Sequence, residues 1–129
     1  MIRTWPIIGV RDVARSIAWY QRLFGHAPTP PAHDHFGMVC DEDGTVLLCL
    51  HAWGAHEHPT LTRPGADDAN GLLLFFRVAD YDGVLARVHT ANMALEQGPL
   101  RNPNTGTMEF SLRDPDGYYV SISAQSPTP

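Results

Sequence analysis

The chain carries the same succession of structural signals twice, and this repetition restricts the folds available to it more than any other feature. Val10–Val13 recurs 68 residues later as Val78–Tyr81, in both cases with an aspartate placed just before a helix-like stretch. Asp41–Gly44 and Asp114–Gly117 both read Asp-x-Asp-Gly and lie 73 residues apart. Two motifs that recur at nearly equal offsets predict an internal repeat, in which each half of the chain contains a strand, a capped helix and a hairpin.

The apolar pattern that follows each repeated aspartate predicts a helix. Asp12 and Asp80 are the expected N-caps, because an aspartate side chain can accept hydrogen bonds from the first helical turn. Apolar residues such as Ile17 and Tyr20 then follow at helical spacing, and Gly25 is placed to end the first helix. The expected strands are Trp5–Val10, Thr45–Leu50, Leu72–Val78, Met108–Leu112 and Tyr118–Ser123.

A length of 129 residues is normal for one domain. We therefore expect a single domain over residues 1–129, with a first module at about 1–55 and a second module at about 71–125. The connecting loop, at about 52–70, is rich in Gly, Pro, His and Asp. At this length it is expected to be a lid or a partly ordered arm rather than a plain linker.

Charge and hydropathy exclude several classes of partner. The net charge is −5 and Lys and Arg are not clustered, so no nucleic-acid partner is expected. No apolar run exceeds Leu72–Phe76, which is far shorter than the roughly 20 residues of a membrane helix. Trp5–Val10 is too short for the apolar core of a signal peptide, so a cytoplasmic protein without a membrane partner is expected. Cys40 and Cys49 do not lie opposite each other in the expected hairpin, so both are expected to be free thiols.

The repeated signals resemble a known family. The residues that carry the resemblance are Val10-x-Asp12-Val13, Ser16-Ile17-x-Trp19-Tyr20, Leu23-Phe24-Gly25, Phe110 and Asp114-Pro115-Asp116-Gly117. This pattern resembles the vicinal oxygen chelate superfamily, which includes glyoxalase I enzymes, bleomycin-resistance proteins, fosfomycin-resistance transferases and extradiol dioxygenases. The resemblance implies an α+β fold of two βαβββ modules, whose mixed sheets form a U-shaped trough with the helices outside and a small-molecule ligand inside. Because one scaffold supports many chemistries, the fold does not identify the function.

The resemblance also implies where a metal would bind. In metal-using members, one divalent ion is held in the trough by His, Glu or Gln from four strand positions. The corresponding residues here are Trp5, Leu48, Leu72 and Ser121. Indole and isobutyl groups do not coordinate such a cation. We therefore expect no metal and no other cofactor, and no glyoxalase or dioxygenase chemistry at these positions.

Among the branches of this superfamily, the pattern is closest to the metal-free bleomycin-resistance type. Pro6–Val13 follows the early proline, apolar strand and Asp-capped helix of that group. A proline in a strand removes a ladder donor and favours a sheet edge or a swapped partner. The resemblance implies a small-molecule ligand that is bound rather than transformed, and a homodimer with cavities between subunits. Whether the dimer is domain-swapped stays open.

Strand alternation extends the set of side chains expected to line the trough. Trp5 either stacks on a planar or cationic ligand or fills the space that relatives give to the metal. Glu109 is either a general base or an ordinary strand glutamate. The apolar members either line a ligand cavity or fill a closed core. The expected ligand-binding residues are Trp5, Ile7, Leu48, Leu50, Leu72, Leu74, Phe76, Glu109, Ser111, Tyr119 and Ser121.

Two short patterns place two imidazoles one residue apart. They are His33-Asp34-His35 and His56-Glu57-His58, and such a pair can share a metal in an extended chain. Both fall in expected loops, and no third ligand is fixed by spacing, so solvated loops are favoured. His51 follows a strand and is placed at the rim of the trough.

Three functions remain open at this point. The favoured one is a metal-free protein that captures a small, partly aromatic compound such as an antibiotic. The second is an enzyme of the same superfamily, an isomerase, lyase or dioxygenase, with Glu109 as base or with metal ligands from His51, His56, Glu57 or His58. The third is a structural or regulatory dimer without a small ligand.

Overall fold

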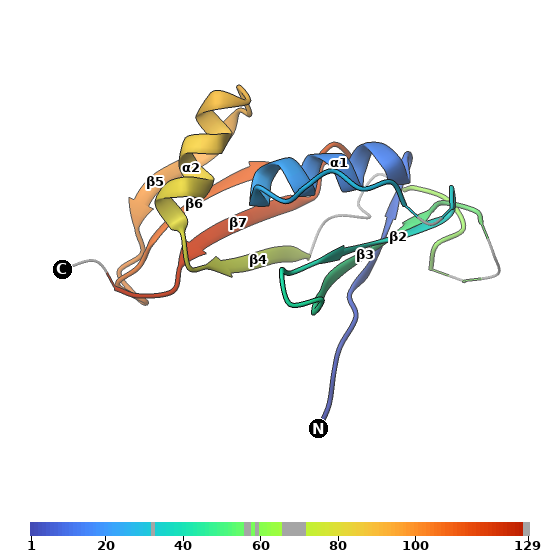
Figure 1. Ribbon diagram of the computed structural model, residues 1–129, viewed down its shortest axis with the longest axis horizontal. Coiled ribbons are helices and arrows are strands. Elements are labelled where there is room, and N and C mark those ends of the chain that lie inside the picture. The colour runs from blue at the N-terminus through green and yellow to red at the C-terminus, as the bar shows by residue number, and fades with distance from the viewer. Residues whose placement is uncertain (32, 56–57, 59, 66–71, 128–129) are drawn as a thin grey trace. The chain divides into compact units, whose positions relative to one another are not determined.

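The computed structural model describes residues 1–31, 33–55, 58, 60–65 and 72–127 and shows an α+β protein (Figure 1). The chain divides into two compact units, Met1–Asp68 and Ala69–Pro129. Each unit combines one helix with one mixed sheet, which confirms the expected fold class. No helix in the described part of the chain has the length and apolar composition needed to cross a membrane.

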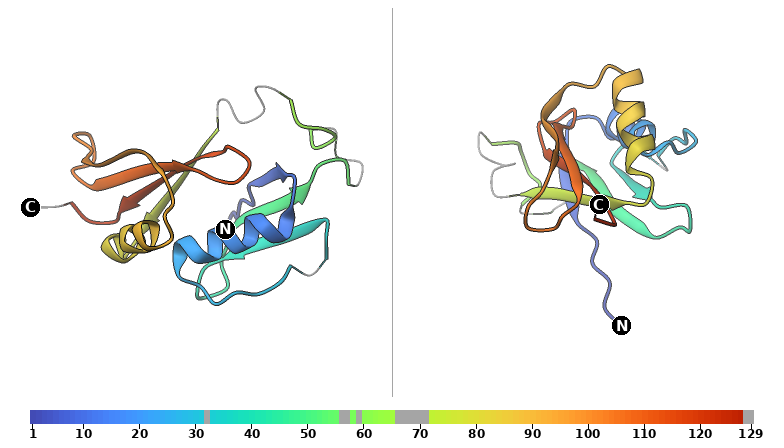
Figure 2. Two further views of the ribbon diagram at one scale, coloured as in Figure 1. Left: turned by 90° about the horizontal axis from the view of Figure 1, so that it is seen from above. Right: turned by 90° about the vertical axis from the view of Figure 1, so that its left-hand side faces the viewer.

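The first unit packs its helix on one face of a three-stranded sheet (Figure 2). Its elements are β1 (Ile7–Val10), α1 (Val13–Phe24), β2 (Phe36–Cys40) and β3 (Val46–Ala52). The strand order is β1-β3-β2, with β1 parallel and β2 antiparallel to β3. The side chains that α1 buries are Val13, Ser16, Ile17, Tyr20 and Leu23. The core of this unit therefore lies between the helix and the sheet.

The second unit repeats this order with one more strand. Its elements are β4 (Leu73–Val78), α2 (Tyr81–Thr90), β5 (Leu95–Arg101), β6 (Met108–Arg113) and β7 (Tyr119–Ala124). The strand order is β4-β7-β6-β5, with β4 parallel to β7 and the other pairs antiparallel. The side chains that α2 buries are Tyr81, Val84 and Val88.

The repeated aspartates begin both helices as predicted. The Asp12 side chain accepts a hydrogen bond from the Arg15 amide at 3.0 Å, and the Asp80 side chain accepts one from the Gly83 amide at 3.0 Å. Gly25 ends α1 with a φ of 71°. Both N-caps pair a helix donor that has no partner within the helix, which is why the motif recurs.

The two Asp-x-Asp-Gly sequences form equivalent turns before β3 and β7. The carbonyl oxygens of Asp41 and Asp114 accept hydrogen bonds from the amides of Gly44 at 2.9 Å and Gly117 at 3.0 Å. The two glycines have φ values of 86° and 89°, in the left-handed region that other residues rarely adopt. The sequence repeat is therefore a repeat of backbone geometry.

The first unit departs from the expected βαβββ module. It has three described strands, whereas the module implies four. Val39 pairs with Leu48 but Cys40 pairs with Val46, so Leu47 is an extra residue in β3. Cys40 therefore lies opposite Val46 and not opposite Leu47, which would be its partner in a regular hairpin with a two-residue turn at Asp43-Gly44. In the second unit, β5 is a strand that the sequence did not predict.

Candidate functional site

Each sheet has one face against its helix and an open face on the other side. In the first unit Gly37 marks the helix side, because a Cβ atom there would collide with Ile17 of α1. Leu50 pairs with Gly37, and Leu48 pairs with Val39. Leu48 and Leu50 are therefore fully buried on the helix side. Sequence alternation had placed both on the ligand face, and the register corrects this.

The extra residue Leu47 explains the displacement. Because side chains alternate along a strand, one inserted residue moves all later residues to the opposite face. The fourth residue after the hairpin glycine is Leu48 in the first unit and Ser121 in the second, yet only Ser121 is on the open face of its sheet. In the first unit Cys49 takes the open-face position instead.

Two rows of paired residues cross the open face of the first unit from β1 through β3 to β2. The first row is Ile7, Cys49 and Met38, and the second is Gly9, His51 and Phe36. The Trp53 indole lies against Gly9, because a Cβ atom there would overlap it. Ile7 is 46% exposed and Met38 is 43% exposed, whereas Cys49 between them is fully buried. The free edges of this face are therefore apolar and accessible.

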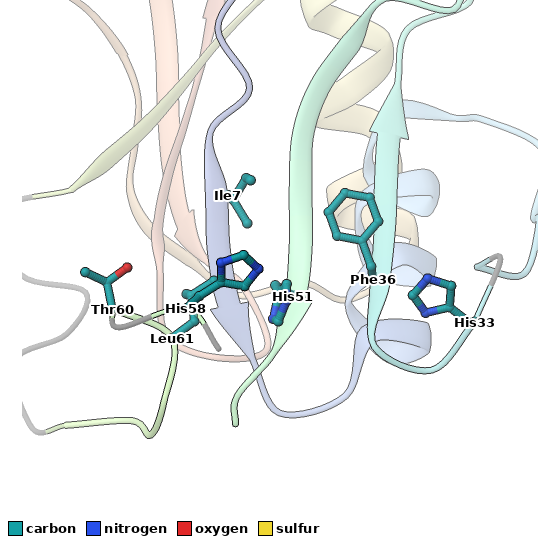
Figure 3. Close-up of a pocket in the computed structure, with 7 residues that line it drawn as sticks. All are labelled: Ile7, His33, Phe36, His51, His58, Thr60 and Leu61. Carbon is teal, nitrogen blue, oxygen red and sulfur yellow. The ribbon is translucent and has the colours of Figure 1, made fainter. Parts of the chain in front are cut away.

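A pocket of about 420 Å³ lies on this face, near the end of β3 (Figure 3). The centroid of the His51 ring is 4.9 Å from that of His58 and 6.4 Å from that of Phe36, in both cases edge to face. The pocket is lined by Ile7, His33, Phe36, His51, His58, Thr60 and Leu61. All of these residues belong to the first unit. Apolar and aromatic walls with a few polar groups are typical of a small-molecule site.

The segment after β3 folds back on itself and supplies part of the lining. The Gly54 amide donates a hydrogen bond to the Leu61 carbonyl oxygen at 2.8 Å, and the Leu61 amide donates one to the His58 carbonyl oxygen at 2.9 Å. These bonds hold His58, Thr60 and Leu61 beside the sheet residues of the pocket.

His51 is the buried polar residue of the pocket, with 3% of its surface exposed. Its Nδ1 atom lies 2.8 Å from the carbonyl oxygen of Ala52. Because a carbonyl oxygen can only accept, Nδ1 is the donor and carries the ring proton. In the neutral ring Nε2 then has a lone pair and is a hydrogen-bond acceptor.

In the second unit, the register again divides the predicted residues between two faces. Phe110 marks the helix side, since its ring centroid is 5.6 Å from that of Tyr81 in α2. Phe110 pairs with Ile122, which pairs with Phe76. Phe76 and Leu74, two positions earlier, are therefore on the helix side of β4. The sequence analysis expected both side chains on the ligand face, but the residues next to them in β4 occupy that face.

The open-face residues of β4 are Leu73, Phe75 and Arg77, and of these Leu73 is 52% and Phe75 is 43% exposed. Leu72, the predicted site residue, precedes the strand. Leu73 pairs with Tyr119, and Phe75 pairs with Ser121. The sequence analysis began this strand at Leu72, one residue before β4 begins. The residues expected on the open face are therefore one position away from those that the structure places there.

Four predicted site residues share the open face of the second unit: Glu109, Ser111, Tyr119 and Ser121. The hydroxyls of Ser111 and Ser121 are 2.8 Å apart and both side chains are buried, so one hydroxyl donates a hydrogen bond to the other. Glu109 is half-buried, and both of its carboxylate oxygens lie 3.3 Å from Nδ2 of Asn102, which donates to them. Strands β6 and β7 therefore make their part of this face polar, whereas β4 adds the apolar Leu73 and Phe75 to it.

Of the predicted ligand-binding residues, Ile7 alone lines the pocket of the first unit. Trp5 precedes β1 and is 53% exposed. The sequence did contain a signal for Phe36, because the hairpin pairing that sets Cys49 opposite Met38 also sets His51 opposite Phe36. His33, Thr60 and Leu61 come from loops, which periodicity does not place.

The sequence profile of the Glyoxalase/Bleomycin resistance protein/Dioxygenase superfamily matches residues 4–122. The chain belongs to this superfamily. Several proteins of known structure share its fold. A glyoxalase/bleomycin resistance protein from Catenulispora acidiphila is 21% identical, with a TM-score of 0.67 over 98% of this chain and 100% of that chain. TioX from Micromonospora is 18% identical, with a TM-score of 0.69 over 98% and 100%. A glyoxalase/dioxygenase from Nostoc punctiforme is 17% identical, with a TM-score of 0.67 over 95% and 89%. No curated protein sequence is significantly similar to this chain.

The donor set of this superfamily member does not fit a divalent metal. With the register corrected, the strand positions that resemble metal-ligand positions hold Trp5, Cys49, Leu73 and Ser121. Among these only a thiol and a hydroxyl have donor atoms. Burial raises the pKa of Cys49, and Cys40 raises it further, so the metal-binding thiolate form is disfavoured.

Among the described residues, the imidazoles do not complete such a site either. His51 and His58 are neighbours, but their other proposed partners, His56 and Glu57, lie outside the described residues. The part of the chain that the structure describes contains no group of three or more His, Cys, Asp or Glu residues that could hold a metal ion.

Proposed function

We propose that this superfamily member is a binding protein that captures a small, partly aromatic molecule without using a metal. The observation that carries the proposal is the pocket beside His51, which is large enough for a molecule of several rings and has apolar, aromatic and imidazole walls. The absence of suitable donors at Cys49 and Leu73 supports the metal-free part of the proposal.

The test combines metal analysis with ligand titration. Protein purified without chelator is analysed for metals by mass spectrometry, and aromatic compounds are then titrated by calorimetry. We expect only trace metal and saturable binding of aromatic compounds. The variant Phe36→Ala should weaken this binding about tenfold, because it removes a large apolar wall of the pocket. A stoichiometric metal, or no binding of any compound, would overturn the proposal.

A second candidate is an enzyme that uses Glu109 as a general base. It is favoured by the open face of the second unit, where the carboxylate of Glu109 is held by Asn102 and shares the face with a buried pair of serine hydroxyls. Any turnover found for a bound compound should then fall at least a hundredfold in Glu109→Gln. Glu96→Gln, at an exposed carboxylate on the next strand, is the matched control. Unchanged turnover in Glu109→Gln would remove this candidate.

We also propose a cytoplasmic homodimer, with the trough implied by the family fold as its ligand site. Large apolar side chains on the open faces support self-association, namely Ile7, Met38, Leu73 and Phe75. Two free thiols, Cys40 and Cys49, suit a reducing compartment. Analytical ultracentrifugation should give twice the chain mass of 14.3 kDa, and a monomer at all concentrations would refute the dimer.

A further inference from the structure

We infer that the pocket of the first unit selects flat aromatic carboxylates, and that the Nε2–H group of His33 donates the hydrogen bond that recognises the carboxylate. The inference rests on the proposed function and narrows it to one chemical class. It also gives a specificity role to His33, for which the sequence favoured a solvated loop.

The first step is the position of the His33 side chain. The main chain of His33 forms an antiparallel bridge with Phe36, the first residue of β2. The amide of Ala52, the last residue of β3, donates a hydrogen bond to the carbonyl oxygen of His35 at 2.9 Å. These bonds fix the turn before β2 to the sheet. The His33 imidazole is therefore held at one end of the pocket that it lines, beside Phe36 (Figure 3).

The second step is the tautomer of this imidazole. The main-chain amide of His35 donates a hydrogen bond to Nδ1 of His33 at 3.2 Å. Nδ1 therefore keeps its lone pair, and in the neutral ring the proton is on Nε2. Within the described part of the chain, the His33 side chain forms no second hydrogen bond, and the residue is exposed. His33 consequently offers a hydrogen-bond donor to a molecule in the pocket.

The third step is the row of rings beside this donor. The ring centroids are 6.5 Å apart from His33 to Phe36, 6.4 Å from Phe36 to His51 and 4.9 Å from His51 to His58. The rings of His33 and Phe36 are tilted by only 34° and show their faces side by side in Figure 3. A flat aromatic ring buries well against such faces and gains from contact with them. The ligand body is therefore expected to be flat and aromatic, next to the His33 donor.

The fourth step is the charge of the recognised group. Among the described residues, those that line the pocket include no Asp or Glu, so an ammonium group finds no anionic partner there. Thr60, at the opposite end of the pocket from His33, adds an exposed hydroxyl that can also donate. A hydrogen bond to an ionised acceptor is roughly twice as strong as a neutral one. A carboxylate therefore gains more from these donors than a hydroxyl or an amine.

The experiment compares three probes of one ring system by calorimetry at neutral pH: 2-naphthoate, 2-naphthylmethanol and 2-(aminomethyl)naphthalene. We expect 2-naphthoate to bind wild-type protein about tenfold more tightly than the alcohol, in line with one charge-assisted hydrogen bond at an exposed donor. The amine should bind most weakly. In His33→Phe, which keeps an aromatic wall, the naphthoate and the alcohol should bind within about a factor of two of each other.

His35→Phe is the matched control. The His35 ring is not part of the described pocket lining, and the substitution keeps the main-chain amide that holds Nδ1 of His33. This variant should keep the tenfold preference for 2-naphthoate. If it abolishes the preference as fully as His33→Phe, the cause is the charge of the whole turn, and the inference is overturned.

A second readout does not depend on any variant. In ¹⁵N spectra of the wild-type imidazoles, Nε2 of His33 should shift more on addition of 2-naphthoate than on addition of the alcohol. A preference for naphthoate that survives in His33→Phe overturns the inference, and so does tighter binding of the alcohol or the amine to wild-type protein. In these cases capture of aromatic compounds stands and the role of His33 falls. If none of the probes binds, the proposed function falls as well.

Discussion

Replacing Leu50 by alanine separates the structure from the orientation that simple alternation predicts. Leu50 has no exposed surface and lies on the helix side of the first sheet. Removing three buried carbon groups loses about 0.8 kcal/mol each, and the remaining cavity raises the total to about 3 kcal/mol. With an unfolding entropy of about 2.1 cal/mol/K per residue over 129 residues, Tm should fall by about 11 °C.

The assay is urea unfolding followed by circular dichroism, with calorimetry for Tm. The matched control is Met38→Ala, on the open face of the same sheet, where a side chain that is 43% exposed should cost about 1 kcal/mol or less. Any aromatic compound that the wild-type protein binds should bind Leu50→Ala equally well, measured below the unfolding transition of the variant. A variant of wild-type stability that no longer binds the compound would show that Leu50 lines the ligand site, and the assignment of faces would be wrong.

Three further results are expected. Tyr81→Phe should leave stability unchanged or raise it by up to about 1 kcal/mol in urea unfolding, because the Tyr81 hydroxyl is buried without a hydrogen-bond partner in the described structure; a clear loss would reveal a missing partner. At pH 8 a thiol reagent should modify Cys40 much faster than Cys49, whose pKa is raised by burial and then by Cys40, and equal rates would contradict this. The hydrogen bond from Arg113 lowers the pKa of Glu96, so the stability it adds should be complete above the ordinary glutamate pKa and disappear as the pH falls through the lowered value; the urea midpoints of wild type and Glu96→Gln should therefore converge in acid, and a constant difference would argue against the pair.

Much of the fold could be predicted because the decisive signals are local. The caps at Asp12 and Asp80 and the glycine of each Asp-x-Asp-Gly turn act within four residues, so they are visible in any sequence window. Strand β5 could not be predicted in this way. It is a largely exposed edge strand containing Gly98 and Pro99, and its pairing with β6 is irregular, so it shows no alternation.

The candidate site was less predictable, for two physical reasons. The face to which Leu48 and Leu50 belong depends on a bulge at Leu47, and a bulge changes the register without any marker residue. The pocket also requires a loop that returns His58 and Leu61 to the sheet through main-chain hydrogen bonds, which any sequence can make.

A single extra amino acid in β3 decides which side chains of that strand reach the open face of the first half. From β3 this face carries a thiol and an imidazole, beside Ile7 of β1, whereas the open face of the second half carries hydroxyls and a carboxylate beside Leu73 and Phe75. Inserting or deleting one codon can therefore exchange the side chains that one strand presents, without substituting any of them. When recognition residues are transferred from one half to the other, the correspondence between positions changes by one residue after Val46.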